Sequence, residues 1–235
     1  MKIIHIITGL NNAGAEGVLT RLISNDKKNK HIIISLKGLD FFGNILLSKK
    51  ITVYSMNLNK NYLNIKILFK INEIINEHNP NIIQSWMYHS DLIISILKIF
   101  FRIKIPIYWN VRNSNVPIKL SNFKILLVIR ICAIFSYFVP TKILSCAESI
   151  RKEHLKIGYK DIFTIIPNGF DPNLYDHNEY HRNKLRKYLN ISNNFVIGII
   201  GRWHPQKNHI FLFKLLNKLK KRKINNWKLV LAGRN

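Results

Sequence analysis

Hydrophobic runs of strand length alternate with longer amphipathic stretches along most of this 235-residue chain. The runs predict seven strands, over residues 2–8, 31–36, 51–55, 81–84, 107–110, 142–146 and 163–166. Apolar residues at helical spacing predict helices between them, over residues 15–24, 65–78, 90–101, 123–138 and 148–158. This alternation is typical of βα units around a parallel sheet. The pattern therefore predicts an α/β fold with a Rossmann-like sheet.

A polar stretch separates this pattern from a second, shorter one. Residues 171–194 contain one short helix candidate, 179–188, and are expected to form an interdomain linker. The expected domains are thus an amino-terminal domain over 1–170 and the first part of a second Rossmann-like domain over 195–235. The second part is expected to form one βαβ unit, with strands over 195–200 and 228–232 and a helix over 209–222.

The balance of charge indicates an anionic partner. Lys and Arg number 37 and Asp and Glu 12, a formal net charge of +25. Nucleic acid, an anionic membrane surface and phosphorylated substrates all fit such a field. The alternative is a compositional bias, because Lys, Ile and Asn are abundant throughout. The two Cys residues form no CxxC motif or Cys/His cluster, which argues against a disulfide framework and a structural zinc site.

Localisation is expected to be cytoplasmic, because the amino terminus lacks the features of a secretory signal. Two apolar segments, 92–109 and 123–140, carry internal charges, and the second is shorter than the roughly 20 residues of a span. Neither is expected to cross a membrane. Residues 123–138 are expected to form a buried helix. The alternative is a peripheral helix whose Lys124 and Arg130 contact lipid phosphates.

The first predicted strand leads into a loop with two glycines. Residues 8–16 read TGLNNAGAE, so Gly9 and Gly14 lie between a strand and a helix. Backbone N–H groups at such a place suit a phosphate or a sugar hydroxyl. Asn11 breaks the GxGxxG spacing of dinucleotide-binding loops, which argues against a nicotinamide or flavin cofactor. A simple tight turn explains the glycines equally well.

A histidine follows the fourth predicted strand, at the sheet edge where open α/β sheets bind ligands. The segment 84–91 reads QSWMYHSD, and His89 could bond a sugar hydroxyl or a phosphate oxygen. Trp86 and Tyr88 offer flat faces for a ring. The alternative is a histidine that caps the next helix or is satisfied in the core.

Two cations follow the first strand of the second pattern. Residues 201–208 read GRWHPQKN, with Arg202 near the strand end and Lys207 near the next helix start. Two cations beside a helix amino end form a pyrophosphate site, and the alternative is ordinary surface charge. The sequence contains no Ser/His/Asp set, HExxH or Walker motif, which argues against a hydrolase, a metalloprotease and a P-loop NTPase.

Five segments together resemble the family 4 glycosyltransferases, retaining enzymes of the GT-B fold with two Rossmann-like domains facing across a cleft. The segments are GAE at 14–16, WMYH at 86–89, IPNGFD at 166–171, GRWHPQKN at 201–208 and LAGRN at 231–235. The resemblance implies that Gly14 lies against donor phosphates or the acceptor and that His89 contacts the transferred sugar. It implies that Arg202 and Lys207 neutralise the donor diphosphate. Glu16 matches as well, although the helix dipole alone explains a carboxylate there.

The resemblance also implies the reaction. The chain is expected to be a retaining hexosyltransferase that uses a nucleotide-diphosphate sugar, with no cofactor and no metal ion. The expected acceptor is a glycan or lipid-linked molecule of surface polysaccharide biosynthesis, at the inner face of the cytoplasmic membrane. Family members continue past the LAGRN segment to a Glu-x7-Glu motif that this sequence does not contain. We therefore expect a truncated chain that is inactive alone.

Two other classes of function stay open. A basic, non-enzymatic protein that binds nucleic acid or a membrane surface would also use the charge, although the basic residues are dispersed and no RRM, KH or helix-turn-helix signature occurs. A sugar-nucleotide epimerase of the same two-domain fold would share the phosphate site. Measuring binding to DNA and to anionic vesicles distinguishes the first class from a glycosyltransferase. Product analysis distinguishes the second.

Overall fold

The computed structural model describes residues 1–58, 65–113, 123–191 and 193–233. The chain divides into two compact units, Met1–Gly169 and Phe170–Asn235, which we call unit 1 and unit 2.

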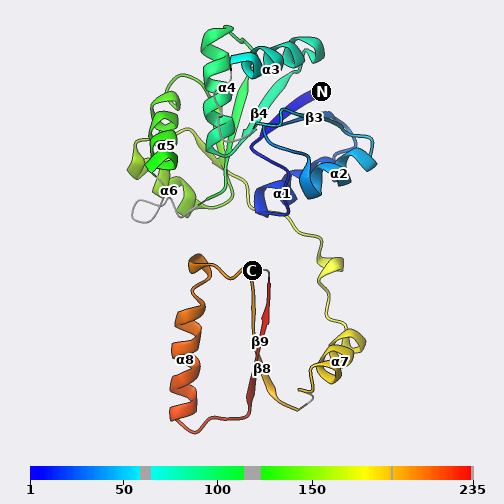
Figure 1. Ribbon diagram of the computed structural model, residues 1–235. Coiled ribbons are helices and arrows are strands. Elements are labelled where there is room, and N and C mark those ends of the chain that lie inside the picture. Colours follow the sequence, from blue (N-terminus) through cyan, green and yellow to red (C-terminus); the bar gives the residue numbers. More distant parts are fainter. Residues whose placement is uncertain (59–64, 114–122, 192, 234–235) are drawn as a thin grey trace. The chain divides into compact units, whose positions relative to one another are not determined.

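Unit 1 contains a seven-stranded sheet in the order β3-β2-β1-β4-β5-β6-β7, and all its strand pairs are parallel (Figure 1). The order reverses between β1 and β4, where doubly wound sheets have their topological switch point. The strands are β1 (Lys2–Ile7), β2 (Lys30–Ser35), β3 (Thr52–Ser55), β4 (Ile82–Trp86), β5 (Ile107–Val111), β6 (Lys142–Ser145) and β7 (Phe163–Ile165). The predicted parallel α/β architecture is confirmed.

Six helices in the described part of unit 1 connect the strands. They are α1 (Gly14–Asn25), α2 (Asp40–Ser48), α3 (Ile65–His78), α4 (Tyr88–Phe100), α5 (Phe123–Phe135) and α6 (Glu148–Ile157). The sequence pattern missed α2, which is nine residues long and has Gly43 near its middle. A Cβ at Gly43 would lie 2.8 Å from Leu39 Cβ, so tight packing requires the glycine that made the segment look unlike a helix.

Apolar residues of the central strands alternate between the two faces of the sheet. Ile4 and Ile6 of β1 belong to a large core that α3, α4, α5 and α6 cover, whereas Ile7 belongs to a smaller core under α1 and α2. Because both faces are buried, these strands read as continuous hydrophobic runs.

Helix α5 is buried on one side. Ile129, Cys132 and Ala133 lie in the core. The opposite side and the turn after the helix expose a stripe of apolar side chains that we call the α5 stripe: Phe123, Leu127, Ile134, Tyr137 and Phe138. The prediction of a buried helix is thus right for one face, and the helix ends at Phe135, three residues before the predicted end. In the described part of the chain, no helix is long and apolar enough to cross a membrane.

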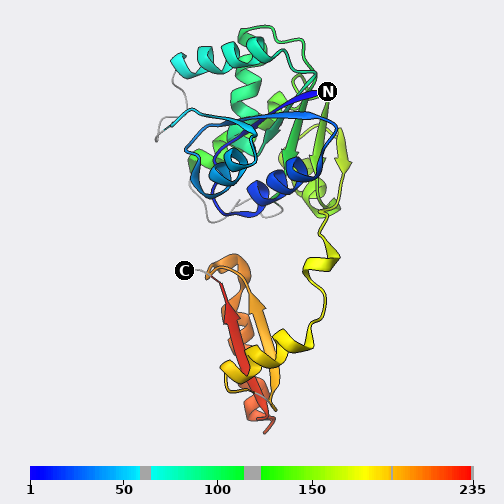
Figure 2. The same ribbon diagram turned by 90° about the vertical axis from the view of Figure 1, so that its right-hand side faces the viewer.

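Unit 2 pairs two parallel strands, β8 (Phe195–Ile200) and β9 (Trp227–Ala232). Helices α7 (Glu179–Tyr188) and α8 (His209–Lys221) lie on opposite faces of this pair (Figures 1 and 2). Two short 3-10 turns, η1 (Pro172–Leu174) and η2 (Pro205–Lys207), precede α7 and α8.

Candidate functional site

The carboxyl edge of the unit 1 sheet is built from loops that hydrogen bonds hold together. The backbone N–H of Lys37, just after β2, donates to the Thr8 carbonyl after β1 at 3.0 Å. The Phe42 N–H donates to the Leu10 carbonyl at 2.8 Å, which joins α2 to the first loop. These bonds fix the glycine-containing loop against its neighbour.

Gly14 and Glu16 lie in the first turn of α1. Gly14 is exposed, and a Cβ added to it would have no heavy atom within 4 Å, so packing within the described part of the chain does not require this glycine. Glu16 is half-buried, and burial, followed by the charge of Asp40, raises the pKa of its carboxyl. A carboxylate with a raised pKa at a sheet edge is a candidate for proton exchange as well as for dipole stabilisation.

His89 is the second residue of α4 and is half-buried at the same edge. Burial, and then the nearby charge of Lys37, lowers the pKa of its imidazole, which keeps the ring neutral at pH 7. The position before the helix is Met87, whose φ of 70° and ψ of 162° fall in a region almost reserved for glycine. Met87, and not His89, is therefore the amino-terminal cap, and strained backbone precedes the candidate histidine.

Two further cations belong to this edge and were missed by sequence reasoning. Lys37 follows β2, and Arg112 follows β5. The Arg112 Nε donates to Asn110 Oδ1 at 2.8 Å and its Nη1 donates to Asn168 Oδ1, while the guanidinium lies 5.1 Å from the Trp86 ring centroid. The rule that singled out His89, a polar side chain directly after a strand, would have found both.

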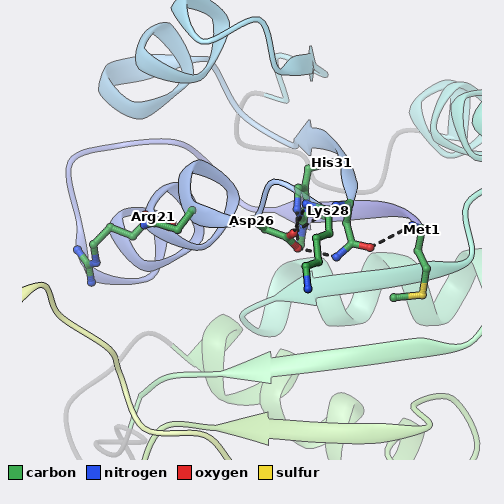
Figure 3. Close-up of polar contacts among 8 residues, drawn as sticks. Met1, Arg21, Asp26, Lys28 and His31 are labelled. Atoms are coloured by element: carbon green, nitrogen blue, oxygen red, sulfur yellow. Dashed lines mark hydrogen bonds and ion pairs between the residues drawn. The ribbon is translucent and has the colours of Figure 1, made fainter.

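Four side chains, of which all but Asp26 are buried, are linked to one another beneath this edge. Asp26 Oδ2 lies 3.2 Å from His31 Nε2, and His31 Nδ1 lies 2.9 Å from His5 Nε2 (Figure 3). The Trp86 indole N–H donates to His5 Nδ1 at 3.3 Å. Because an indole can only donate, His5 must accept at Nδ1 and carry its proton on Nε2. We call this set, which ends under Arg112, the histidine relay.

Arg202 and Lys207 both lie in the loop between β8 and α8 of unit 2, and both are exposed. The aliphatic chain of Lys207 covers Gly201, since a Cβ at Gly201 would lie 3.2 Å from Lys207 Cε. Trp203 of the same loop is 57% exposed and packs on His209 with ring centroids 4.6 Å apart. The loop thus presents two cations and a flat ring at the start of α8.

A second glycine supports this loop. A Cβ at Gly233 would lie 1.9 Å from the Gly201 carbonyl oxygen, so the chain after β9 passes the chain after β8 too closely for any side chain. The Gly201 N–H also donates to the Ala232 carbonyl at 2.8 Å. This close approach explains the glycine at position 233.

The five residues predicted from the sequence therefore divide between the units. Gly14, Glu16 and His89 share the carboxyl edge of the unit 1 sheet, and Arg202 and Lys207 share one loop of unit 2. Their roles in binding and transfer stay predictions. Across the described residues, no group of three His, Cys, Asp or Glu side chains could hold a metal ion.

No known protein family and no curated protein sequence matches this chain. Solved structures do match. Alr3699/HepE of Anabaena in complex with UDP has a TM-score of 0.75 at 18% identity, over 100% of this chain and 70% of that chain. The apo form of the lipopolysaccharide outer core galactosyltransferase WaaB has a TM-score of 0.60 at 12% identity, over 100% of this chain and 68% of that chain.

A UDP-N-acetylglucosamine 2-epimerase from Rickettsia bellii also matches, with a TM-score of 0.51 at 15% identity, over 99% of this chain and 62% of that chain. At these identities the likeness concerns the fold. The chain therefore has the Rossmann-like α/β fold of these solved structures.

Proposed function

We propose that this chain is a glycosyltransferase of the GT-B type that takes a sugar from a nucleotide-sugar donor. The observation that carries the proposal is the loop between β8 and α8, where Arg202 and Lys207 are exposed beside a helix start. The fold neighbour HepE, which was crystallised with UDP and with UDP-glucose, supports a nucleotide sugar as the ligand. In this proposal unit 1 binds the acceptor and unit 2 the donor.

The chemistry required is stabilisation of separating charge. When the bond between the sugar and the nucleotide diphosphate breaks, negative charge grows on the leaving phosphate and positive charge on the anomeric carbon. Arg202 and Lys207 would bind the leaving diphosphate, and the start of α8 would add its dipole. These cations would serve without a metal ion or cofactor, in keeping with a family 4, retaining hexosyl transfer.

His89 would bind the sugar undergoing transfer. A neutral imidazole donates one hydrogen bond and accepts another, which suits sugar hydroxyls. Burial and Lys37 favour that neutral form by lowering its pKa. Gly14 and Glu16 would line the same edge, with the backbone N–H groups at the start of α1 open to acceptor or phosphate oxygens.

The proposed acceptor is a glycan or lipid-linked molecule of surface polysaccharide biosynthesis, used at the cytoplasmic face of a membrane. The α5 stripe supports a peripheral membrane position, because Phe123 and Phe138 are 76% and 75% exposed. Arg130 is also exposed on α5, so the stripe combines apolar and cationic groups as membrane-surface helices do.

A sugar-nucleotide epimerase is a second candidate. One fold neighbour favours it, the UDP-N-acetylglucosamine 2-epimerase from Rickettsia bellii. Another, S. aureus MnaA, was crystallised with UDP. An epimerase would bind the same donor without needing an acceptor.

Product analysis with radiolabelled nucleotide sugars, carried out on an active enzyme that contains this chain, tests the proposal. A glycosyltransferase moves the label to an added acceptor, whereas an epimerase returns a labelled nucleotide sugar of changed configuration. Binding of UDP should weaken about tenfold in Arg202→Ala and in Lys207→Ala, since each loses a charge-assisted contact. Lys214→Ala is the matched control, because Lys214 is exposed on α8 outside the loop. UDP binding that neither loop substitution changes would refute the assignment.

A further inference from the structure

Arg112 is a half-buried cation, and the side chains that it bonds and stacks on are neutral. Its Nε and Nη1 donate to the amide oxygens of Asn110 and Asn168, and its plane lies over Trp86. A guanidinium carries five N–H groups. Within the described residues, its hydrogen bonds use only two of the five.

Arg21 brings a second guanidinium to the same edge. It lies on α1 and folds back along the helix, since a Cβ at Gly17 would lie 3.6 Å from Arg21 Nη1. Figure 3 shows that its side chain points away from Asp26, the nearest acid after α1. Burial lowers the pKa of Arg112, Cys146 acts against it, and the charge of Arg21 lowers the pKa further. Arg112 lies over Trp86 of the smaller core that α1 covers, so both cations belong to the same face of the sheet.

The acids of this edge do not neutralise the pair. Glu16 and Asp40 lie nearby on α1 and α2, but none of the carboxylates in the described ranges comes within ion-pair distance of Arg21 or Arg112. A partly desolvated arginine beside another arginine is costly unless an anion joins them.

We propose that Arg112 and Arg21 bind an oxyanion of the acceptor, so that the acceptor is a sugar that carries a phosphate or a carboxylate. This inference rests on the proposed function, in which unit 1 is the acceptor side. The planar fork of a guanidinium matches the paired oxygens of either group. The anion would bind to the guanidinium of Arg112, which stacks on Trp86 at the same edge of the sheet as His89.

The test is equilibrium binding of three probes to the 235-residue chain: glucose 1-phosphate, glucuronate and neutral glucose. We expect glucose 1-phosphate or glucuronate to bind at least about tenfold more tightly than glucose. Whichever of the two binds more tightly identifies the oxyanion. Equal binding of all three probes would overturn the proposal.

Variants locate the site. Arg21→Gln and Arg112→Gln should each weaken binding of the preferred anion about tenfold, and Arg112→Lys should recover part of it. Arg130→Gln, which removes the same charge from exposed α5, should leave binding unchanged. If Arg112→Gln melts at a lower temperature, Arg21→Gln decides, because Arg21 is exposed on α1.

A folded Arg21→Gln that binds the anion fully, or an Arg130→Gln with the same loss, would refute the site. UDP binding in parallel separates this inference from the proposed function. Arg21→Gln should leave UDP binding intact, whereas failure of the chain to bind UDP would contradict the donor assignment and leave the anion result standing.

Discussion

Removing the His5 imidazole should reduce the loss of unfolding free energy that unit 1 undergoes as the pH falls. Burial, followed by the neighbouring His31, lowers the pKa of His5 from 6.5 to about 3. Protonation would place a hydrogen on Nδ1 against the Trp86 indole N–H, two donors face to face. The folded state therefore binds this proton less readily than the unfolded chain.

The change in unfolding free energy with pH follows from the linkage between proton binding and folding. A lowered histidine pKa makes the folded state lose stability as pH falls below 6.5, down to about 3. For these two pKa values, His5 should cost about 2 kcal/mol of unfolding free energy between pH 7 and pH 5. Asp91 acts with the opposite sign, because burial raises the pKa of its carboxyl. The useful quantity is thus the difference between the wild type and a His5 variant.

Urea unfolding at pH 7 and pH 5, followed by tryptophan fluorescence, measures this difference. In His5→Phe and in His5→Asn, the fall in unfolding free energy between pH 7 and pH 5 should be about 2 kcal/mol smaller than in the wild type. His5→Phe should also be less stable at both pH values by about 1–3 kcal/mol, because it leaves the Trp86 N–H without its acceptor. If both variants keep the wild-type drop between pH 7 and pH 5, the relay does not hold His5 neutral.

Three further predictions concern the proposed function. In an active enzyme that contains this chain, Arg202→Ala or Lys207→Ala should cost about 2–4 kcal/mol of transition-state stabilisation, which steady-state kinetics would measure; near-wild-type turnover in both contradicts the role. His89→Ala should lower transfer far more than stability, and a variant that unfolds at much lower denaturant while its folded fraction keeps full specific activity would make His89 structural. Phe123→Ser and Phe138→Ser should reduce co-sedimentation with phosphatidylglycerol vesicles several-fold, while unchanged sedimentation would remove the α5 stripe from membrane contact.

Most of the fold could be predicted because periodicity is a local property of the sequence. The buried runs of β1 and β2 and the amphipathic α3 stand out clearly, and α3 has the predicted bounds, Ile65–His78. The prediction failed at α2, where Gly43 lies tightly against Leu39, just before the helix, and against Leu10 of the first loop. Element type is thus encoded locally, whereas a glycine required by tertiary packing is not.

The candidate site could be predicted only in part. His89 follows a strand, so chain position alone placed it at the carboxyl edge of the sheet. Arg112 also follows a strand, at the same edge of the sheet. The residues that it contacts, Trp86 and Asn168, are far from it in the sequence. The histidine relay likewise depends on strand register, since β1 pairs His5 with Ile33 rather than with His31. Long-range pairing of this kind has no local signature.

The central claim is that the loop between β8 and α8 binds the donor diphosphate. Titration of the isotope-labelled chain with UDP-glucose, followed by backbone amide resonances, tests it most directly. We predict saturable shifts centred on Gly201, Arg202 and Lys207, which Arg202→Ala abolishes and Lys214→Ala preserves. Saturable shifts that leave this loop untouched, or no saturable shifts at all, would contradict the account.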